Sequence, residues 1–296
     1  MYLFIFNPVA GRGRSVKIFE DVKKIFDDAG QVYEVWQTTR AGEAKQLAQQ
    51  AIKKNYRNIV SVGGDGTLLE VVTGLFGYEC NLGVIPAGTG NDFVRSLGIG
   101  ADHIHAAKVI LLGNIRNVDI GSTIENNYFV NVAGTGFDTE VVRYTEQFKA
   151  SFNGQAAYVL GILRSVFAYK NKRMRITMDG NTIEKKVFLI AIANGYTYAG
   201  GMKVAPNATP FDGYFDVTLF EAIPNYKVPV LLPSFIKGKH ERIKQISSYK
   251  CREVTVEFID GSGPINMDGE IIGSTPMTFK IAEKAFKMFV PEQANK

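Results

Sequence analysis

Two glycine-rich loops in this sequence carry residue types that suit phosphate chemistry. The first, Gly63-Gly64-Asp65-Gly66-Thr67, lies between a β-branched run and an apolar helical pattern. Glycines at such a junction let backbone N–H groups approach an anion, and the helix that follows adds its positive end. Asp65 is suited to hold a divalent metal ion or to polarise a hydroxyl. The loop is predicted to bind phosphate, and the alternative is a tight strand-to-helix turn that binds nothing.

The second loop repeats this composition. It reads Pro86-Ala87-Gly88-Thr89-Gly90-Asn91-Asp92-Phe93, and it again follows a predicted strand and opens a helix. A third segment, from Asn7 to Arg14, adds two arginines, Arg12 and Arg14, whose guanidinium groups suit phosphate. If none of the three segments bound a ligand, their shared position after predicted strands would be a coincidence.

The elements around these loops alternate between strand and helix. Strands are predicted at residues 2–6, 32–36, 58–62 and 82–85, and helices at 15–29, 43–54 and 67–76. This alternation indicates a parallel, doubly wound sheet with helices on both faces. Ligands of such sheets bind beyond the carboxyl ends of the strands, where the three segments and Thr38-Thr39 all fall.

After about Asp119 the pattern changes to short strands. Strand-like segments lie near residues 128–134, 173–179, 182–193, 214–221, 252–258 and 276–281, and helical patterns at 137–149, 155–169 and 226–237. Turn signals such as Asp179-Gly180-Asn181 separate them. The pattern predicts a second, β-rich domain with mostly antiparallel pairing.

Composition bounds the class of protein. The chain has 296 residues, a formal net charge of +5 and two cysteines. Because there are only two cysteines, a disulfide framework is not expected, and the expected compartment is a reducing cytoplasm. The mild positive charge favours an anionic partner but does not indicate nucleic acid, for which no binding module is recognisable. The apolar run at residues 2–6 is too short for a signal peptide, and no run approaches the ~20 residues of a spanning helix.

Competing motifs do not match. The sequence has no Walker A spacing, no complete dinucleotide fingerprint, no protein-kinase H-R-D and no nucleophile elbow. His103, His105 and His240 lack partners at metal-ligand spacing and are expected to be structural or surface residues. Cys80 and Cys251 are expected to be buried packing residues.

Taken in order, NPVAGRG, GGDGTLLEVV and PAGTGNDFVR resemble the catalytic domain shared by diacylglycerol kinases, sphingosine kinases and bacterial lipid kinases. The resemblance continues through Val118–Gly121, Ala205–Ala208, Phe211–Gly213 and Met267–Glu270, over essentially the whole chain. It implies an α/β nucleotide-binding domain like that of NAD kinases, formed by residues 1–120 plus about 282–296, and a β-rich sandwich domain at 121–281. The implied reaction transfers the γ-phosphate of ATP to a lipid hydroxyl, with diacylglycerol as the first expected acceptor.

The resemblance also assigns residues. It implies ATP contacts for Asn7, Thr38, Gly63, Gly64, Asp65, Gly66, Thr67, Gly88, Thr89 and Asn91. It places Asp65, Asp92 and Asp119 around a catalytic Mg²⁺ through water, and Asp212, with main-chain oxygens near Thr209 and Tyr214, at a structural Mg²⁺. It supplies Asp268 or Glu270 as the base, whereas the residues alone predict only a hairpin turn there. Leu69, before Glu70, departs from the Asn of bacterial members.

Alternatives to the diacylglycerol kinase prediction remain. GGDGTLL also occurs in NAD kinases, but GTGNDF and the segment Asp268-Gly269-Glu270 near the C-terminus favour the lipid kinases. The acceptor could be another lipid, such as a sphingoid base, monoacylglycerol, undecaprenol or phosphatidylglycerol, and a non-catalytic nucleotide or lipid sensor is a further class. The basic, aromatic segments 156–175 and 237–244 are predicted either to contact an anionic phospholipid surface or to pack on the core. A cytoplasmic protein at the inner membrane face is expected, and the resemblance implies a homodimer.

Overall fold

The computed structural model describes residues 1–149, 154–240 and 243–292. The chain divides into two compact units. Unit 1 comprises Met1–Ile120, Thr209–Gly213 and the C-terminal segment from Ala282, and unit 2 comprises Gly121–Ala208 and Tyr214–Ile281. The predicted class, an α/β architecture followed by a β-rich one, is confirmed. The sequence pattern did not indicate that residues 209–213 return to unit 1.

Unit 1 is built on a parallel sheet with the strand order β2-β1-β3-β4-β15. The strands are β1 (Tyr2–Phe6), β2 (Tyr33–Gln37), β3 (Asn58–Gly63), β4 (Asn81–Pro86) and the C-terminal part of β15 (Met277–Phe289). β1, β3 and β4 are almost wholly buried. Burial on both faces explains their continuous apolar runs, which are typical of parallel sheets.

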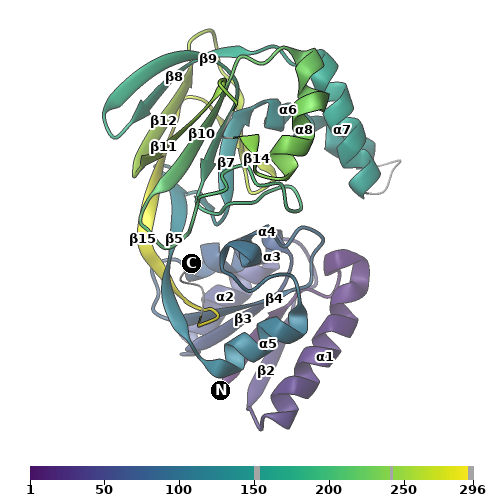
Figure 1. Ribbon diagram of the computed structural model, residues 1–296. Helices are drawn as coiled ribbons and strands as arrows, with labels where there is room; N and C mark the ends of the chain where they lie inside the picture. Colours follow the sequence, from purple (N-terminus) through teal and green to yellow (C-terminus); the bar gives the residue numbers. More distant parts are fainter. Residues whose placement is uncertain (150–153, 241–242, 293–296) are drawn as a thin grey trace. The chain divides into compact units, whose positions relative to one another are not determined.

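The helices of unit 1 form two packed pairs. They are α1 (Arg14–Asp28), α2 (Glu43–Lys53), α3 (Asp65–Leu75), the short α4 (Asp92–Ser96) and α5 (His103–Leu112), with a 3₁₀ turn η1 (Ala10–Gly13). α1 packs with α5 and α2 with α3 (Figure 1). α1 buries Phe19, Val22 and Phe26 along one stripe, and Phe26 meets Phe4 of β1 edge-on at 5.0 Å. The connection from β1 to β2 and the connection from β2 to β3 run in opposite directions across the sheet. Because such crossovers are right-handed, α1 and α2 lie on opposite faces of the sheet.

Unit 2 is antiparallel throughout its described pairings. Its strands are β6 (Tyr128–Phe129), β7 (Val132–Gly136), β8 (Lys172–Met178), β9 (Asn181–Ala193), β10 (Phe215–Glu221), β11 (Ile246–Cys251), β12 (Glu253–Phe258), β13 (Pro264–Met267), β14 (Glu270–Ser274) and the first part of β15. One apolar cluster lies among the strands and includes Ile176, Val217 and Phe279. A second cluster lies beneath α6 (Phe137–Lys149), α7 (Gly154–Ala168) and α8 (Val228–Ile236), which gather on one side of the sheet (Figure 1).

Several predicted elements differ from the structure. The strand β5 (Ile115–Thr123) and the helix α5 were not predicted. Within the basic segment 156–175, the predicted helix at 155–169 and strand at 173–179 are confirmed, because α7 ends at Ala168 and β8 begins at Lys172. Of the segment 237–244, Glu241 and Arg242 lie outside the described residues. In the described part of the chain, no helix has the length and apolar character needed to span a membrane.

The expected packing roles of the cysteines and of one histidine are confirmed. Cys80 and Cys251 are buried free thiols, and burial raises their pKa values to about 11 and about 12. Thiols with such pKa values are poor nucleophiles at neutral pH. His240 is fully buried, and its Nε2 lies 3.2 Å from the backbone oxygen of Val204.

Candidate active site

The loops that follow β1 and β3 meet where the strand order reverses. β1 and β3 are neighbours, and the chain leaves them toward opposite sides of the sheet. The Asn7 side chain, directly after β1, donates from Nδ2 to Thr67 Oγ1 at 2.9 Å and accepts from the Val9 N–H at 3.1 Å. Ligands of doubly wound sheets bind at this kind of switch point. The Asn7–Thr67 hydrogen bond therefore marks the candidate site.

Close packing within and between the two glycine loops explains most of their glycines. A Cβ built on Gly88 would lie 2.4 Å from the Cα of Gly64, and one on Gly63 would lie 2.5 Å from Thr67 Oγ1. These glycines are required by packing, which the sequence interpretation as a phosphate cradle did not anticipate. Gly66 is different, because it is exposed and no atom lies within 4 Å of its Cβ position.

The start of α3 is open to an anion. Its N-cap, Gly64, provides no side-chain hydrogen bond. The first backbone bond of the helix runs from Leu68 N–H to Gly64 O, so the N–H groups of Asp65, Gly66 and Thr67 have no acceptor within the helix. These N–H groups and the helix dipole together favour a negatively charged group beside Gly66.

Asp65 and Asp92 bring two carboxylates to this place. Asp65 Oδ1 accepts from the N–H groups of Asp92 at 2.9 Å and Phe93 at 3.3 Å, which fixes the start of α4. A Cβ on Gly90 would lie 2.9 Å from Asp65 Oδ2 and 3.3 Å from Asp92 Oδ2, so both oxygens face one point. Burial, and then the charge of Asp92, raise the pKa of Asp65. Two like charges so placed favour a proton or a cation between them.

This donor set fits a magnesium ion. Mg²⁺ usually keeps several waters and is bound through one or two carboxylates together with substrate phosphates. Among residues 1–149, 154–240 and 243–292, no three acidic, histidine or cysteine side chains are arranged to hold a metal by themselves. The pair Asp65 and Asp92 therefore suits an ion whose other ligands come from water and phosphate.

Asp119 is grouped with other acids. This buried side chain on β5 accepts from Gly213 N–H through Oδ2 and from Lys284 N–H through Oδ1, both at 2.7 Å. Burial raises its pKa and the two hydrogen bonds oppose that effect, while Glu283 and Asp212 raise it further. Asp119 N–H also donates to Pro210 O at 2.8 Å. Asp119 thus pins the segment Thr209–Gly213, which contains the predicted structural Mg²⁺ residues Thr209 and Asp212.

The remaining predicted nucleotide residues have distinct environments. Asn91 has a left-handed φ of 51°, and its side chain bonds both the N–H and the O of Gly88 at 2.9 and 3.0 Å, which closes the second loop. Thr38 is buried, and its N–H donates to Phe6 O at 2.9 Å. Thr89 is exposed. Tyr214 belongs to unit 2, where the Arg252 guanidinium lies over its ring at 4.9 Å.

Glu70 has a structural role that the sequence did not indicate. Its carboxylate accepts from the N–H groups of Gly42 at 2.9 Å and Ala44 at 3.0 Å, and so caps α2. α2 needs this long-range cap because its own N-cap, Gly42, has no side chain. Leu69 is half-buried beside it. Replacement of the family Asn by Leu69 thus leaves the Glu70 cap intact.

In unit 2, Asp268 lies in the turn between β13 and β14, and Glu270 is the first residue of β14. Asp268 and Gly269 have left-handed φ values of 49° and 93°, and Met267 pairs with Glu270. The predicted hairpin turn is confirmed. The Asp268 carboxylate accepts three backbone N–H groups, from Val130 at 2.7 Å and from Asn131 and Val132 at 3.0 Å. Glu270 is exposed.

The same turn is also held by the buried side chain of Asn266, which is hydrogen-bonded to buried Asp138. Asn266 accepts from Gly269 N–H at 3.0 Å through Oδ1 and donates from Nδ2 to Asp138 Oδ2 at 3.0 Å. Asp138 is buried at the start of α6, and burial raises its pKa from 3.8 to about 6. Sequence reasoning missed Asp138 and Asn266.

Comparison with known proteins agrees with this arrangement. Residues 1–123 match the diacylglycerol kinase catalytic domain, and residues 131–290 match the YegS C-terminal NAD kinase beta sandwich-like domain. A diacylglycerol kinase of Bacillus subtilis (strain 168) is 30% identical over 292 residues, which cover 98% of this chain and 96% of that protein. A diacylglycerol kinase of Staphylococcus aureus (strain MRSA252) is 31% identical over 290 residues, covering 97% and 91%. This chain belongs to the diacylglycerol kinase family.

Solved structures support membership of the family. The structure of a candidate diacylglycerol kinase from Bacillus anthracis str. Sterne has a TM-score of 0.79 at 25% identity and covers 99% of this chain and 98% of that one. A diacylglycerol kinase structure from the same organism, at 22% identity and a TM-score of 0.75, shares the fold. The chain is accordingly a lipid kinase of this family.

Asp138 gives this family member a measurable pH dependence. Because its folded pKa is raised, the native state keeps this proton up to about pH 6, and stability is lost as the pH rises from about 4 to about 6. The substitution Asp138→Asn keeps an acceptor for Asn266 and removes the buried charge. Between about pH 4 and about pH 7, we expect the free energy of unfolding to fall by about 3 kcal/mol less in the variant than in wild type.

Urea unfolding followed by far-UV circular dichroism measures this difference. Tryptophan fluorescence would not report on unit 2, which contains Asp138, because Trp36, the only tryptophan, lies in unit 1. Asp28→Asn, at an exposed position, is the matched control. If the free energies of unfolding of wild type and Asp138→Asn changed in parallel with pH, ionisation of Asp138 in the native state would not lower stability, and the prediction would be wrong.

Proposed function

We propose that this protein is an ATP-dependent lipid kinase that phosphorylates diacylglycerol to phosphatidic acid. The observation that carries the proposal is the convergence of Asp65 and Asp92 on one point beside the open N-terminus of α3. Phosphoryl transfer needs positioned charge rather than covalent participation of the protein. The relatives named above are diacylglycerol kinases, which supports this acceptor over the other lipids and NAD.

In the proposed mechanism, unit 1 binds the nucleotide phosphates. The N–H groups of the first turn of α3 donate to phosphate oxygens, and Asn7 and Asn91 keep the two loops in place. Asp65 and Asp92 would hold Mg²⁺, which neutralises charge on the transferring phosphate when it is bound. Asp212, with Thr209 and Tyr214, would hold a structural Mg²⁺, while Asp119 orients the segment that carries Asp212.

The base of the proposed reaction is Glu270. An exposed carboxylate is available to accept a proton from a lipid hydroxyl. Asp268 is less suited, because three backbone N–H groups already hold its oxygens. In this proposal Asp268 positions the turn and Glu270 takes the proton. In this proposal the enzyme binds peripherally at the inner membrane face and takes its lipid there. The proposal also includes assembly of the enzyme as a homodimer.

The test is transfer of labelled γ-phosphate from ATP with Mg²⁺ to acceptors in mixed micelles. The panel contains diacylglycerol, monoacylglycerol, sphingosine, undecaprenol and phosphatidylglycerol, with soluble NAD alongside. Labelled phosphatidic acid is the expected product, and its formation should stop when Mg²⁺ is chelated. Transfer to another lipid alone, or to NAD alone, would replace diacylglycerol as the acceptor. ATP binding without any product would favour a sensor.

A further inference from the structure

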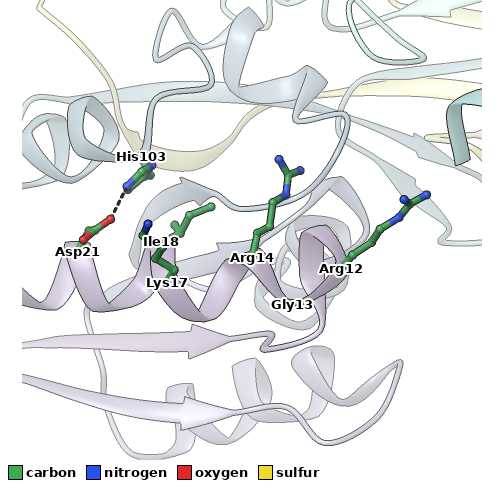
Figure 2. A pocket seen from close by; sticks show the side chains of 7 residues that line it. All are labelled: Arg12, Gly13, Arg14, Lys17, Ile18, Asp21 and His103. Carbon is green, nitrogen blue, oxygen red and sulfur yellow. Dashed lines mark hydrogen bonds and ion pairs between the residues drawn. The ribbon is translucent and has the colours of Figure 1, made fainter. Parts of the chain in front are cut away.

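Three neighbouring strands of unit 1 are each followed by a helix, and the starts of these helices differ in charge. α1 follows β1, and the turn before it and its first residue supply Arg12 and Arg14, which line a pocket there (Figure 2). The start of α3, after β3, has no side-chain cap. The start of α2, after β2, is closed by the protein itself, because the Glu70 carboxylate accepts the N–H groups of Gly42 and Ala44. A bound phosphate is therefore favoured at α3 and disfavoured at α2.

The loop between β2 and α2, residues 38–42, lies at the same edge of the sheet as the two glycine loops. β2 pairs with β1 in parallel, and β1 pairs with β3. Neighbouring strands are ~4.8 Å apart, so the end of β2 lies about 10 Å along this edge from the end of β3. A nucleoside whose phosphates lie at the start of α3 can thus reach the loop. Thr38, the first residue of the loop, is one of the expected ATP contacts.

Glu70 joins this loop to α3. It lies on the same helix as the open N–H groups, five residues, or about 7.5 Å, after Asp65. Its two oxygens each accept one N–H at the start of α2, and hydrogen bonds to a carboxylate are stronger than those between neutral groups. One turn further along α3, Gly74 packs so closely on α2 that a Cβ there would lie 2.5 Å from Lys45 O. This crossing keeps the two helices packed, and Glu70 adds a bond from α3 to the end of the loop 38–42.

The start of α3 is held in place independently of Glu70. The Asn7 side chain donates to Thr67 Oγ1 at 2.9 Å. Asp65 accepts the N–H of Asp92, also at 2.9 Å. Loss of the Glu70 carboxylate should therefore leave the N–H groups that suit a phosphate where they are.

The loop 38–42, in contrast, depends on Glu70 for its position relative to α3. The N–H and Oγ1 of Thr39 both donate to Glu43 Oε2, at 2.5 and 2.9 Å, and Glu43 belongs to α2 itself. The N–H of Thr38 donates at 2.9 Å to the last residue of β1. Neither of these contacts reaches α3. Without the Glu70 carboxylate, the end of the loop is free to shift while the phosphate-facing helix stays in place.

We propose that Glu70 is a positioning residue for ATP, which holds the loop 38–42 against α3 so that the loop can contact the nucleoside. Its own oxygens are occupied by backbone N–H groups, so it acts through the loop and not by touching the nucleotide. The inference rests on the proposed function, because it takes ATP as the ligand of the glycine loops. It follows that affinity for ATP depends on Glu70, whereas affinity for a ligand made of phosphates alone does not.

Glu70→Gln tests this inference, because the amide keeps one acceptor oxygen and replaces the other with a donor that cannot bond an N–H. Dissociation constants of ATP and of inorganic tripolyphosphate, both with Mg²⁺, are measured by titration calorimetry. The variant should bind ATP about tenfold more weakly, the effect of one lost hydrogen bond to a charged group, and tripolyphosphate within about twofold of wild type. In the transfer assay, KM for ATP should rise about tenfold and kcat should change by less than about threefold.

Two further variants sharpen the comparison. Glu79→Gln is the matched control, because it removes a carboxylate that is 85% exposed elsewhere in unit 1, and it should change neither affinity. Glu70→Asp keeps the charge beside α2 but is one methylene shorter, so it should show the same selective loss with a smaller effect on stability. Thermal unfolding followed by Trp36 fluorescence checks that unit 1 is folded, which the packing at Gly74 should preserve.

Two results would overturn the inference. Unchanged ATP affinity in Glu70→Gln would make Glu70 a helix cap without a role in binding. Equal losses of affinity for ATP and tripolyphosphate would mean that the start of α3 had moved as well. Because these titrations need neither lipid nor turnover, a protein that phosphorylates no diacylglycerol can still pass the test, and an active kinase can fail it. A wild-type protein that bound no ATP would contradict the inference and the proposed function together.

Discussion

Asp65→Asn should abolish lipid phosphorylation, lowering turnover by at least about 10³-fold. The amide still accepts the N–H groups of Asp92 and Phe93 that fix α4, so the loops should keep their structure. The substitution removes the negative charge of Asp65, which lies beside the Asp92 carboxylate at the Cβ position of Gly90. Labelled phosphate transfer to micellar diacylglycerol measures the loss, with Asp28→Asn as the control at an exposed position.

The same substitution should not destabilise unit 1. Burial and Asp92 raise the pKa of Asp65, so the ionised carboxylate is less stable in the folded protein than in the unfolded chain. Stability due to this group is lost as the pH rises through its folded pKa, and Asp65→Asn should recover it at neutral pH. Trp36 fluorescence reports the unfolding of unit 1. Mg²⁺ should raise the melting temperature of wild type and not that of the variant. An active, Mg²⁺-responsive variant would remove Asp65 from the metal site.

The sequence predicted the parallel part of the fold well because its signals are local. Continuous apolar runs and helical stripes of residues such as Phe19, Val22 and Phe26 gave the strands β1 to β4 and the helices α1 to α3 to within about two residues. β5 escaped because its first half is largely exposed and polar, with only Val118–Ile120 and neighbours buried. Its partners are distant as well. Asp119 bonds residues 94 and 165 positions away, and no local pattern contains such contacts.

The candidate site shows the same division. The loops were found from their glycines, but the physical role inferred for Gly63, Gly64 and Gly88 was incomplete. The bare Cα atoms of Gly64 and Gly88 let the two loops pack against each other, and that of Gly63 leaves room for the side chain of Thr67 in its own loop. Asn266 and Asp138, which hold the turn of Glu270, are 128 residues apart and carry no local signal of their partnership. Sequence patterns thus predicted where the chemistry lies, and tertiary contacts determine which residues position these loops and this turn.

Glu270→Gln and Asp268→Asn should separate the base from the residue that positions it. Glu270 is exposed, so Glu270→Gln should leave stability unchanged and lower turnover by about 10²- to 10⁴-fold, the usual contribution of a general base. Its affinity for ATP should be retained, because binding of the nucleotide is assigned to unit 1. Equilibrium ATP binding and turnover on micellar diacylglycerol measure the two effects separately.

Asp268→Asn should show the opposite balance. One amide oxygen replaces two carboxylate oxygens that accept three N–H groups, so at least one buried donor loses its partner. The expected cost is about 2 kcal/mol of unfolding free energy, seen by circular dichroism, with a smaller loss of turnover than in Glu270→Gln. If Asp268→Asn were stable and inactive while Glu270→Gln turned over normally, the base would be Asp268. The three N–H groups would then hold the reacting carboxylate itself, and Glu270 would be a surface residue of the hairpin.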